Sequence, residues 1–356
     1  QIRVVSPEMF PFTLAYFTGS KEHNIRMRQL AIDKGLRLNE FGLMPETDIE
    51  GLVGIDAAKY SLSCVDEAQI YHHLGLDWVT PELREDSGEI EAALSKSIPN
   101  LVEVSSIRGA LHNHTTASDG QNTLEEMADE ARRLGWEYIG IADHSPALSI
   151  GGRSIGVDPD AVEIQAGEIT SYNEKMEDQG DIFRVFHGSE CDILPDGKLD
   201  YSEDVRGRFH HVIGSVHAIN TWKSRDEQVN TDAIITAIED PSFTVLGHPT
   251  GRVLQVREGF PVDMLQVIER MGDINGEGEL KAIEINASPY RLDLDWRLCR
   301  TARDHGVPIL INPDAHSIEG LSDIAYGVDI ARKGWLEAKD VLNTLPVEKI
   351  DHLLGK

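Results

Sequence analysis

From residue 107 onward, short apolar runs alternate with longer stretches whose apolar residues recur at helical spacing. A short apolar run bounded by turn residues is typical of a buried strand, and its regular alternation with helices indicates a parallel sheet. The apolar runs cover residues 107–112, 137–142, 182–189, 210–216, 243–247, 281–286 and 307–312. Seven such units predict an α/β fold, a distorted seven-stranded (β/α) barrel.

The clearest helix between these strands is expected at 123–134. Thr123 is a good N-cap residue, because its hydroxyl can accept a hydrogen bond from the first helical turn. Glu125 and Glu126 place negative charge at the positive end of the helix dipole.

The first 80 residues have a different pattern, which predicts a small α+β unit. Its expected elements are a strand at 2–5, a helix at 22–34, short strands near Leu38 and Leu43, and a helix at 64–75. The next stretch is charged and rich in turn residues, which predicts a linker at 81–106. We therefore expect two parts, residues 1–80 and 107–356, joined by this linker.

Polar residues follow the predicted strands at the point where each strand ends. The carboxyl ends of barrel strands meet on one face, where such barrels carry their active sites. A single histidine at such a place is usually a buried structural residue, but coincidence over seven strand ends favours a shared site. The candidates are His112, His114, Asp119, His144, Glu190, His217, His248, Asp314 and His316.

The chemistry of this set indicates bound metal ions. It contains six histidines, two aspartates and one glutamate, which is more than the about four ligands that one zinc ion takes. We expect three divalent ions with one carboxylate shared between two of them. Imidazole and carboxylate ligands without a thiolate suit Mn²⁺, Zn²⁺ or Fe²⁺, and Mn²⁺ is the ion that we favour for activity.

The charge of the chain bears on its partners. The net charge is −28, from 61 acidic and 33 basic residues among 356. Such a protein repels nucleic acid in general, although three divalent ions beside three ligand carboxylates would make the pocket itself positive. A role of the acidity in solubility alone is equally compatible with these numbers.

The cysteines and the hydropathy pattern indicate an intracellular protein. Cys64, Cys191 and Cys299 are far apart, which argues against a disulfide framework and fits the cytoplasm. No apolar run approaches the about 18 residues that a membrane span needs, so no membrane partner is expected. Gln1 lies in a strand-like stretch without a charged leader, so we expect a piece of a longer chain that lacks a signal peptide.

The candidate ligands stand in motifs that resemble the polymerase-and-histidinol-phosphatase (PHP) domain family. The motifs are His112-x-His114, Asp119, Ala142-Asp143-His144, Gly188-Ser189-Glu190, His217, His248 and Asp314-x-His316. The resemblance covers residues 107–352 and implies the PHP fold, with hydrolysis of phosphoester bonds at three metal ions.

The resemblance also implies how the ligands are divided. One ion would take His112, His114, Glu190 and Asp314, a second would take Asp119, His144 and His316, and a third would take Glu190, His217 and His248. Glu190 would then bridge two ions. Our catalytic candidates are Glu190, Asp314 and His144, of which Asp314 and His144 are expected to handle protons.

Two longer strings, 247–252 and 284–293, look like the PHP domain that is fused to bacterial and archaeal family X DNA polymerases. The candidates for substrate binding within them are Arg252, Asn286, Arg291 and Asp293. Both arginines suit phosphate oxygens, and Asn286 suits either the substrate or the orientation of a ligand. The competing interpretation is a structural role, for example an ion pair between Arg291 and Asp293.

The N-terminal part resembles the C-terminal, palm-type subdomain of family X polymerases, which contacts the incoming nucleotide and the template. The residues that carry this resemblance are Tyr16, Phe17, Gly19, Asn24 and Arg28. It implies a 3′→5′ exonuclease in DNA repair, with further processing of 3′-phosphate or abasic ends. The implied partners are nucleotides and DNA 3′ ends, single-stranded or in gapped or primed duplexes, and we expect a monomer.

One departure from the family concerns polymerisation. Family X polymerases use three carboxylates for nucleotidyl transfer; two are absent here, and Gln1 stands where the third should precede Ile2 and Arg3. We therefore do not expect this chain alone to polymerise DNA.

Three other functions share part of this pattern. A small-molecule phosphomonoesterase of the histidinol phosphatase type would use the same pocket but has no use for a nucleotide-contacting segment. An amidohydrolase also begins with His-x-His, but it usually has a lysine or carboxylate on the fourth strand, where this chain has His217. A module that only positions DNA would need a broken ligand set.

Overall fold

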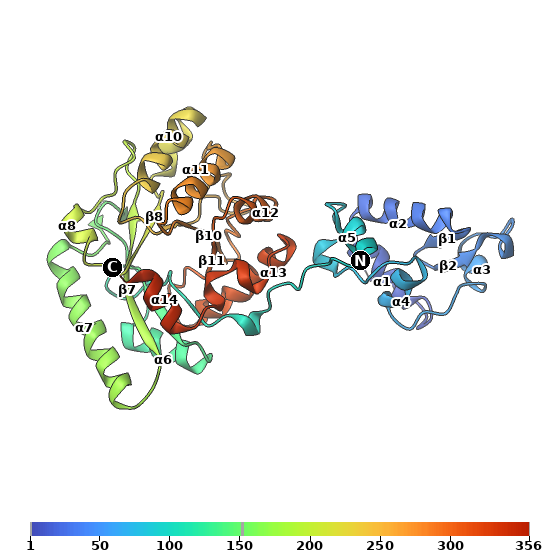
Figure 1. Ribbon diagram of the computed structural model, residues 1–356, viewed down its shortest axis with the longest axis horizontal. Coiled ribbons are helices and arrows are strands. Elements are labelled where there is room, and N and C mark those ends of the chain that lie inside the picture. Colours follow the sequence, from blue (N-terminus) through green and yellow to red (C-terminus); the bar gives the residue numbers. More distant parts are fainter. Residues whose placement is uncertain (1, 151–152, 356) are drawn as a thin grey trace. The chain divides into compact units, whose positions relative to one another are not determined.

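The computed structural model describes residues 2–150 and 153–355. The chain divides between Asn100 and Leu101 into a smaller N-terminal unit and a larger C-terminal unit, each with its own internal contacts (Figure 1). Within the described residues, no helix has both the length and the apolar character needed to cross a bilayer.

The larger unit is built on one sheet of seven parallel strands. These are β3 Gly109–Ala110, β4 Tyr138–Ile141, β7 Arg184–Asp192, β8 His211–Ser215, β9 Val245–Leu246, β10 Ala282–Asn286 and β11 Ile309–Asn312. Their order in the sheet is β11-β10-β9-β8-β7-β4-β3, so the strands are neighbours in the order in which the chain makes them. The predicted α/β barrel and its seven strand positions are confirmed.

Helices connect the strands and cover the outside of the barrel (Figure 1). They are α6 Leu124–Arg133, α7 Pro159–Asp178, α8 Glu203–Arg206, α9 Ile219–Lys223, α10 Glu227–Ile238, α11 Met264–Gly276, α12 Trp296–Asp304, α13 Ile324–Lys333 and α14 Val347–Leu354. The helix expected at 123–134 is α6, and it begins with a capping box between Thr123 and Glu126. A small antiparallel hairpin of β5 Ser149–Ile150 and β6 Arg153–Ser154 precedes α7.

The interior of the barrel is apolar at the end where the strands begin. Residues from six strands pack there in one buried cluster with the apolar side of α14. This cluster contains Tyr138, Phe186, Ile213, Val245, Ala282, Leu310, Val347, Ile350 and Leu354. Because this end is filled, polar groups are left to the carboxyl ends of the strands.

Side-chain amides close the ring between the two outer strands, β3 and β11. Asn343 Nδ2 donates to the carbonyl oxygens of Gly109 and Ile311, at 2.8 and 2.7 Å, and its Oδ1 accepts from Ile311 N at 2.6 Å. Asn312 Oδ1 accepts from Leu111 N at 2.9 Å. In a fully closed barrel, hydrogen bonds between β3 and β11 would satisfy these backbone groups. Here the buried side-chain amides do so instead.

The smaller unit has the expected α+β character. Its elements are α1 Phe10–Thr18, α2 Lys21–Asp33, β1 Leu36–Asn39, β2 Gly42–Pro45, α3 Gly54–Ala58, α4 Glu67–His73 and α5 Glu89–Ser95. The two strands form an antiparallel pair in which Leu38 faces Leu43. Buried His23 joins three helices, because Nδ1 lies 2.6 Å from Glu89 Oε1 and Nε2 lies 2.9 Å from the Tyr71 hydroxyl.

Two expectations for this unit are wrong. Residues 2–5 form no strand and pair with no other strand in the part of the chain that the structure describes. The linker predicted at 81–106 is largely folded, because a 3₁₀ helix at Pro81–Leu83 and helix α5 occupy it. Glu89 is buried there and accepts hydrogen bonds from Asp86 N and Ser87 N. Gln1 lies outside the described residues.

Replacement of Asn343 by alanine should destabilise the larger unit. The change would leave three buried backbone groups of Gly109 and Ile311 without partners, at about 1–3 kcal/mol each. We expect the free energy of unfolding in urea to fall by about 3 kcal/mol or more. Exposed Gln179 provides the matched control, because Gln179→Ala removes an amide without burial. A loss below about 1 kcal/mol in Asn343→Ala would contradict this account of ring closure.

Candidate metal centre

The barrel carries all nine candidate ligands at the carboxyl ends of its strands. His112 and His114 follow β3, Asp119 lies in the loop to α6, His144 follows β4, Glu190 lies in β7, His217 follows β8, His248 follows β9, and Asp314 and His316 follow β11. The structure brings eight of these residues into three overlapping groups whose ligand atoms lie within 4.8 Å of one another. The ninth, His248, contacts Glu190.

The first group contains His112, His114, Glu190 and Asp314, as the family resemblance implied. His112 Nε2 lies 3.3 Å from Glu190 Oε2 and 3.5 Å from Asp314 Oδ1. His114 Nε2 lies 3.5 and 3.0 Å from the same two oxygens. A tetrahedral ion with bonds near 2.1 Å has ligand atoms about 3.4 Å apart, so this spacing suits a metal ion.

The second group gathers around Asp119. Its Oδ1 lies 3.4 Å from His144 Nε2 and 3.3 Å from His316 Nε2, as expected. His114 Nδ1 lies 4.0 Å from the same oxygen and completes the second group. The other ring nitrogen of His114, Nε2, belongs to the first group.

The third group differs in one member from the expectation. The structure groups His144, Glu190 and His217, where the resemblance implied Glu190, His217 and His248. His217 Nε2 and His248 Nε2 both face Glu190 Oε1, at 3.2 and 2.8 Å, while His144 Nδ1 lies 2.9 Å from Glu190 Oε2. Glu190 therefore contacts His144, His217 and His248, so it serves the third group whether His144 or His248 is its third member. Glu190 also belongs to the first group.

Several buried polar atoms at this place lack hydrogen-bond partners. His112 Nε2, Asp119 Oδ1 and Glu190 Oε2 are inaccessible to water and accept or donate no hydrogen bond. Leaving such groups unsatisfied costs about 1–3 kcal/mol each, and they point to one another across ion-sized gaps. The donor set and its spacing therefore fit divalent metal ions.

The protonation of these groups depends on their mutual contacts. Burial disfavours the imidazolium of His144 and His217, but Glu190 and the neighbouring carboxylates raise their pKa to about 9 and about 10. Burial lowers the pKa of His114 to about 4, and His144 and His316 add to that effect. Burial opposes ionisation of Glu190, yet the surrounding imidazoles hold its pKa well below the usual range.

Glu284 orients several residues of the centre and was missed as a candidate. Its Oε2 lies 2.7 Å from His112 Nδ1 and accepts from Asn312 Nδ2 at 2.9 Å. Its Oε1 accepts from His248 N at 3.0 Å and from Asn286 Nδ2 at 2.9 Å. A carboxylate on Nδ1 fixes the histidine so that Nε2 faces the ion. Its position two residues before Asn286 on the same strand face was the available signal.

Two further carboxylates hold the ligand loops. Asp143 accepts from Thr115 N at 2.8 Å, from Thr115 Oγ1 at 2.7 Å and from Gln165 Nε2 at 2.7 Å, and so fixes the loop that follows His114. Asp192 Oδ1 lies 3.0 Å from His217 Nδ1. The sequence placed Asp143 in a motif but gave no reason for its position.

The four substrate-binding candidates have different surroundings. Arg252 donates to Arg291 O and to Asp295 Oδ2, both at 3.0 Å, so it holds a loop. Buried Asp293 accepts from the amide and hydroxyl of Thr250, and burial raises its pKa.

The other two candidates contact the metal centre. Asn286 Nδ2 donates to Asp314 Oδ2 at 3.0 Å, which supports the alternative that it orients a ligand. Arg291 Nε lies 3.6 Å from the same oxygen, so its partner is Asp314 and not Asp293.

The nucleotide-contacting candidates lie together in the smaller unit. Asn24 Nδ2 donates to Tyr16 O at 2.9 Å and to Gly19 O at 3.2 Å, so it fixes the turn between α1 and α2. Tyr16, Asn24 and Arg28 line one small pocket, whereas the side chain of Phe17 is exposed.

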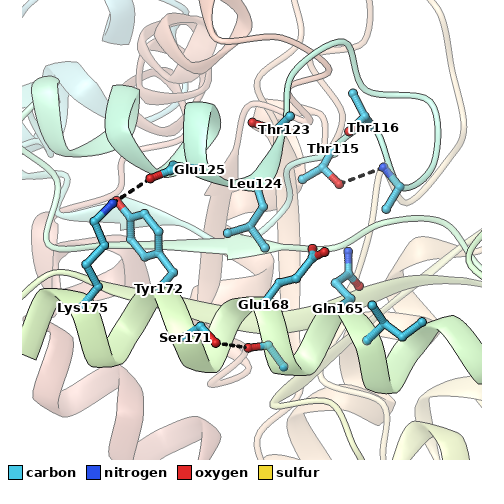
Figure 2. A pocket seen from close by; sticks show the side chains of 13 residues that line it. Thr115, Thr116, Thr123, Leu124, Glu125, Gln165, Glu168, Ser171, Tyr172 and Lys175 are labelled. Carbon is cyan, nitrogen blue, oxygen red and sulfur yellow. Dashed lines mark hydrogen bonds and ion pairs between the residues drawn. The ribbon is translucent and has the colours of Figure 1, made fainter.

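A separate open groove lies between α6 and α7, outside the candidate centre (Figure 2). Its volume is about 960 Å³, and Thr115, Glu125, Gln165 and Lys175 are among its lining residues. Lys175 pairs with Glu125 across it at 2.7 Å. The groove contains none of the nine candidate ligands.

Comparison with known families agrees with this geometry. The PHP domain family matches residues 110–288, half of the chain, and the DNA polymerase beta thumb family matches residues 13–85. The chain therefore belongs to the PHP domain family. The match in the smaller unit is to a thumb, where the sequence analysis had predicted a palm-type subdomain.

Individual relatives cover different parts of the chain. It is 39% identical to the DNA polymerase/3′-5′ exonuclease PolX of Bacillus subtilis, over 99% of this chain and 57% of that protein. The chain thus spans a little over half the length of that curated relative. It is 30% identical to "Probable phosphatase TTE1963" of Caldanaerobacter subterraneus subsp. tengcongensis, over 68% of this chain and 89% of that protein. A Listeria monocytogenes structure described as histidinol phosphatase hisK aligns with a TM-score of 0.44 and 13% identity, over 60% of this chain and 97% of that chain.

Replacement of Glu284 by glutamine should weaken metal binding. Glutamine keeps the shape of the side chain, but its amide nitrogen would face a hydrogen-bond donor such as His112 Nδ1 or His248 N. The ligands would then lose the hydrogen bonds that orient them. We expect a 10–100-fold loss of metal affinity, measured by competition with a chelating dye. Glu269→Gln on the exposed side of α11 is the matched control. Equal affinities of the two variants would show that Glu284 does not orient the ligands.

Proposed function

We propose that this chain is a metal-dependent phosphoesterase that releases nucleotides from DNA 3′ ends, a 3′→5′ exonuclease of DNA repair. The observation that carries the proposal is the convergence of nine imidazole and carboxylate side chains at one end of the barrel, eight in the three ligand groups and His248 in contact with Glu190. Membership of the PHP domain family supports hydrolysis of phosphoesters. The thumb match and the similarity to PolX support DNA as the substrate.

We propose three divalent ions, Mn²⁺ for activity with Zn²⁺ or Fe²⁺ as alternatives, held by the three groups of ligands. When bound, such ions supply Lewis-acid polarisation of the phosphoryl group and lower the pKa of water. The two carboxylate oxygens of Glu190 face different groups of ligands, so Glu190 would bridge two ions. Asn286 fixes one oxygen of Asp314, so that the other can face His114.

The remaining residues would position the substrate and move protons. Arg291 reaches the centre from the loop after β10 and is the candidate for a phosphate oxygen. Arg252 and Asp293 support that loop, so we assign them no direct contact with substrate. Asp314 and His144 are the candidates for proton transfer to the leaving oxygen.

A second candidate function is a phosphomonoesterase of the histidinol phosphatase type. The similarity to a protein named as a phosphatase, which covers 89% of that relative, favours it. Both functions use the same centre. Mn²⁺-loaded protein incubated in parallel with a 5′-labelled single-stranded oligonucleotide and with histidinol phosphate distinguishes them by their kcat/KM values.

Replacement of His114 by alanine should abolish nucleotide release. The ring offers Nε2 to the first group and Nδ1 to the second, so its loss disrupts both. We expect kcat to fall by about 100-fold or more, with an unchanged circular dichroism spectrum. His352→Ala, in the last turn of α14, is the matched control. Wild-type activity in His114→Ala would show that the candidate centre does not take part in the reaction.

Metal binding should release protons and become tighter as pH rises. Without ions, the pKa values of His144, His217 and His316, about 9, about 10 and about 9, keep these rings protonated at pH 7. A metal ligand must be neutral, so each ion displaces protons. Against the effect of burial, Glu284 and Glu190 also hold the pKa of His112 well above its ordinary value, so we expect up to about four protons per saturated molecule at pH 7.

This release is measured by calorimetry of Mn²⁺ binding in buffers of different ionisation enthalpy. The expected affinity increases from pH 6 to about pH 9. Heats that do not depend on the buffer, or an affinity that falls over this range, would contradict the proposed ligands.

A further inference from the structure

Two loops beside the metal centre expose apolar side chains. One follows β9 and His248, and the other follows β10 and Asn286, so both leave the carboxyl ends of neighbouring parallel strands. Tyr290 is 71% exposed, Val256 is 78% exposed and Leu254 is 38% exposed. Tyr290 directly precedes Arg291, whose guanidinium reaches Asp314.

Hydrogen bonds fix these loops to each other. Leu254 N donates to Tyr290 O at 2.6 Å, and Arg252 Nε donates to Arg291 O at 3.0 Å. Val253 and Arg257 pair with each other across a tight turn at the tip of the first loop. The exposed side chains therefore stand on backbone that is already in place before a ligand binds, which lowers the entropic cost of binding.

The same loops hold two arginines that make no hydrogen bond to a carboxylate. Arg291 Nη1 is buried and makes no hydrogen bond, and its nearest carboxylate oxygen is 3.6 Å from Nε. Arg257 forms no ion pair with any described residue, and of its guanidinium nitrogens only Nε donates a hydrogen bond, to Gly251 O at 3.2 Å. Arg257 stands on the loop that hydrogen bonds tie to Tyr290 and Arg291. Burial lowers the pKa of Arg257, and the positive charge of Arg291 adds to this effect. A bound anion would offset the positive charge of both arginines.

We propose that these loops form a nucleotide-binding rim, in which Arg257 and Arg291 bind phosphate oxygens of a DNA strand and Tyr290, with Leu254 and Val256, stacks on the 3′-terminal base. The inference rests on the proposed function and names the part of the site that prefers a nucleic acid strand to a small phosphate ester. Stacking on an aromatic ring accepts any base, because every base has an aromatic face. The rim therefore gives no preference for sequence.

Base stacking is tested with two oligonucleotides that differ only in the 3′-terminal residue, a normal nucleotide or an abasic analogue. In the Mn²⁺-loaded wild type, KM should be about 10-fold lower for the normal end. Tyr290→Ala should bring this ratio close to one, and Tyr290→Phe should restore it. Exposed Tyr326 on α13 provides the control, because Tyr326→Ala should keep the wild-type ratio. A wild-type ratio in Tyr290→Ala would overturn the stacking role.

The phosphate contact is tested by salt dependence. Each phosphate contact on a single strand contributes about 0.7 to the slope of log affinity against log salt concentration. Arg257→Gln should reduce the slope for oligonucleotide KM by about that amount, whereas Arg133→Gln, which removes an exposed charge from α6, should leave the slope as it is. Equal slopes for the two variants would show that Arg257 makes no contact with a DNA phosphate.

A binding measurement separates failure of the rim from failure of the proposed function. Deoxyadenosine monophosphate should bind the Mn²⁺-loaded wild type about 10-fold more tightly than deoxyribose 5-phosphate, and Tyr290→Ala should lose this preference. If the preference is present but no oligonucleotide is degraded, the rim stands and the exonuclease proposal fails. Equal affinities for the two ligands would overturn the rim even in an active exonuclease.

Discussion

Glu190 is a carboxylate with 1% exposure at the mouth of the barrel, and the surrounding structure has to compensate its charge. An unpaired buried charge costs several kcal/mol. The rings of His112, His144, His217 and His248 each place a nitrogen within 3.3 Å of its oxygens. This requirement explains why β3, β4, β8 and β9 each lead into a histidine there, and why the apolar filling is confined to the other end of the barrel.

The same requirement extends to the groups behind the ligands. Glu284 and Asp192 stand behind His112 and His217, so that each ring is held from both nitrogens. Asp314 and His248 adopt positive φ values of 54° and 24°, which residues other than glycine rarely adopt. Such strain persists only where neighbouring contacts overdetermine the backbone, as the hydrogen bonds of Asn286 and Glu284 do here.

Much of this architecture could be predicted from the sequence, because strand periodicity and the polar residues at strand ends are local signals. The grouping of His144 with Glu190 and His217 could not, because it depends on which ring nitrogen faces which oxygen. Arg252 and Arg291 look alike in the sequence, yet one supports a loop and the other reaches Asp314. Burial of Glu89 was missed because its partner, His23, is 66 residues away.

The amide of Asn343 has a consequence for the order in which the chain can fold during synthesis. It lies 234 residues after Gly109, the first-strand residue that it bonds. A nascent chain therefore carries an open sheet edge until residue 343 has left the ribosome. Contacts at such separation slow folding, and unpaired edges favour aggregation in the meantime. A chain that ends shortly before residue 343 would keep this edge open, although it already contains all seven strands of the sheet.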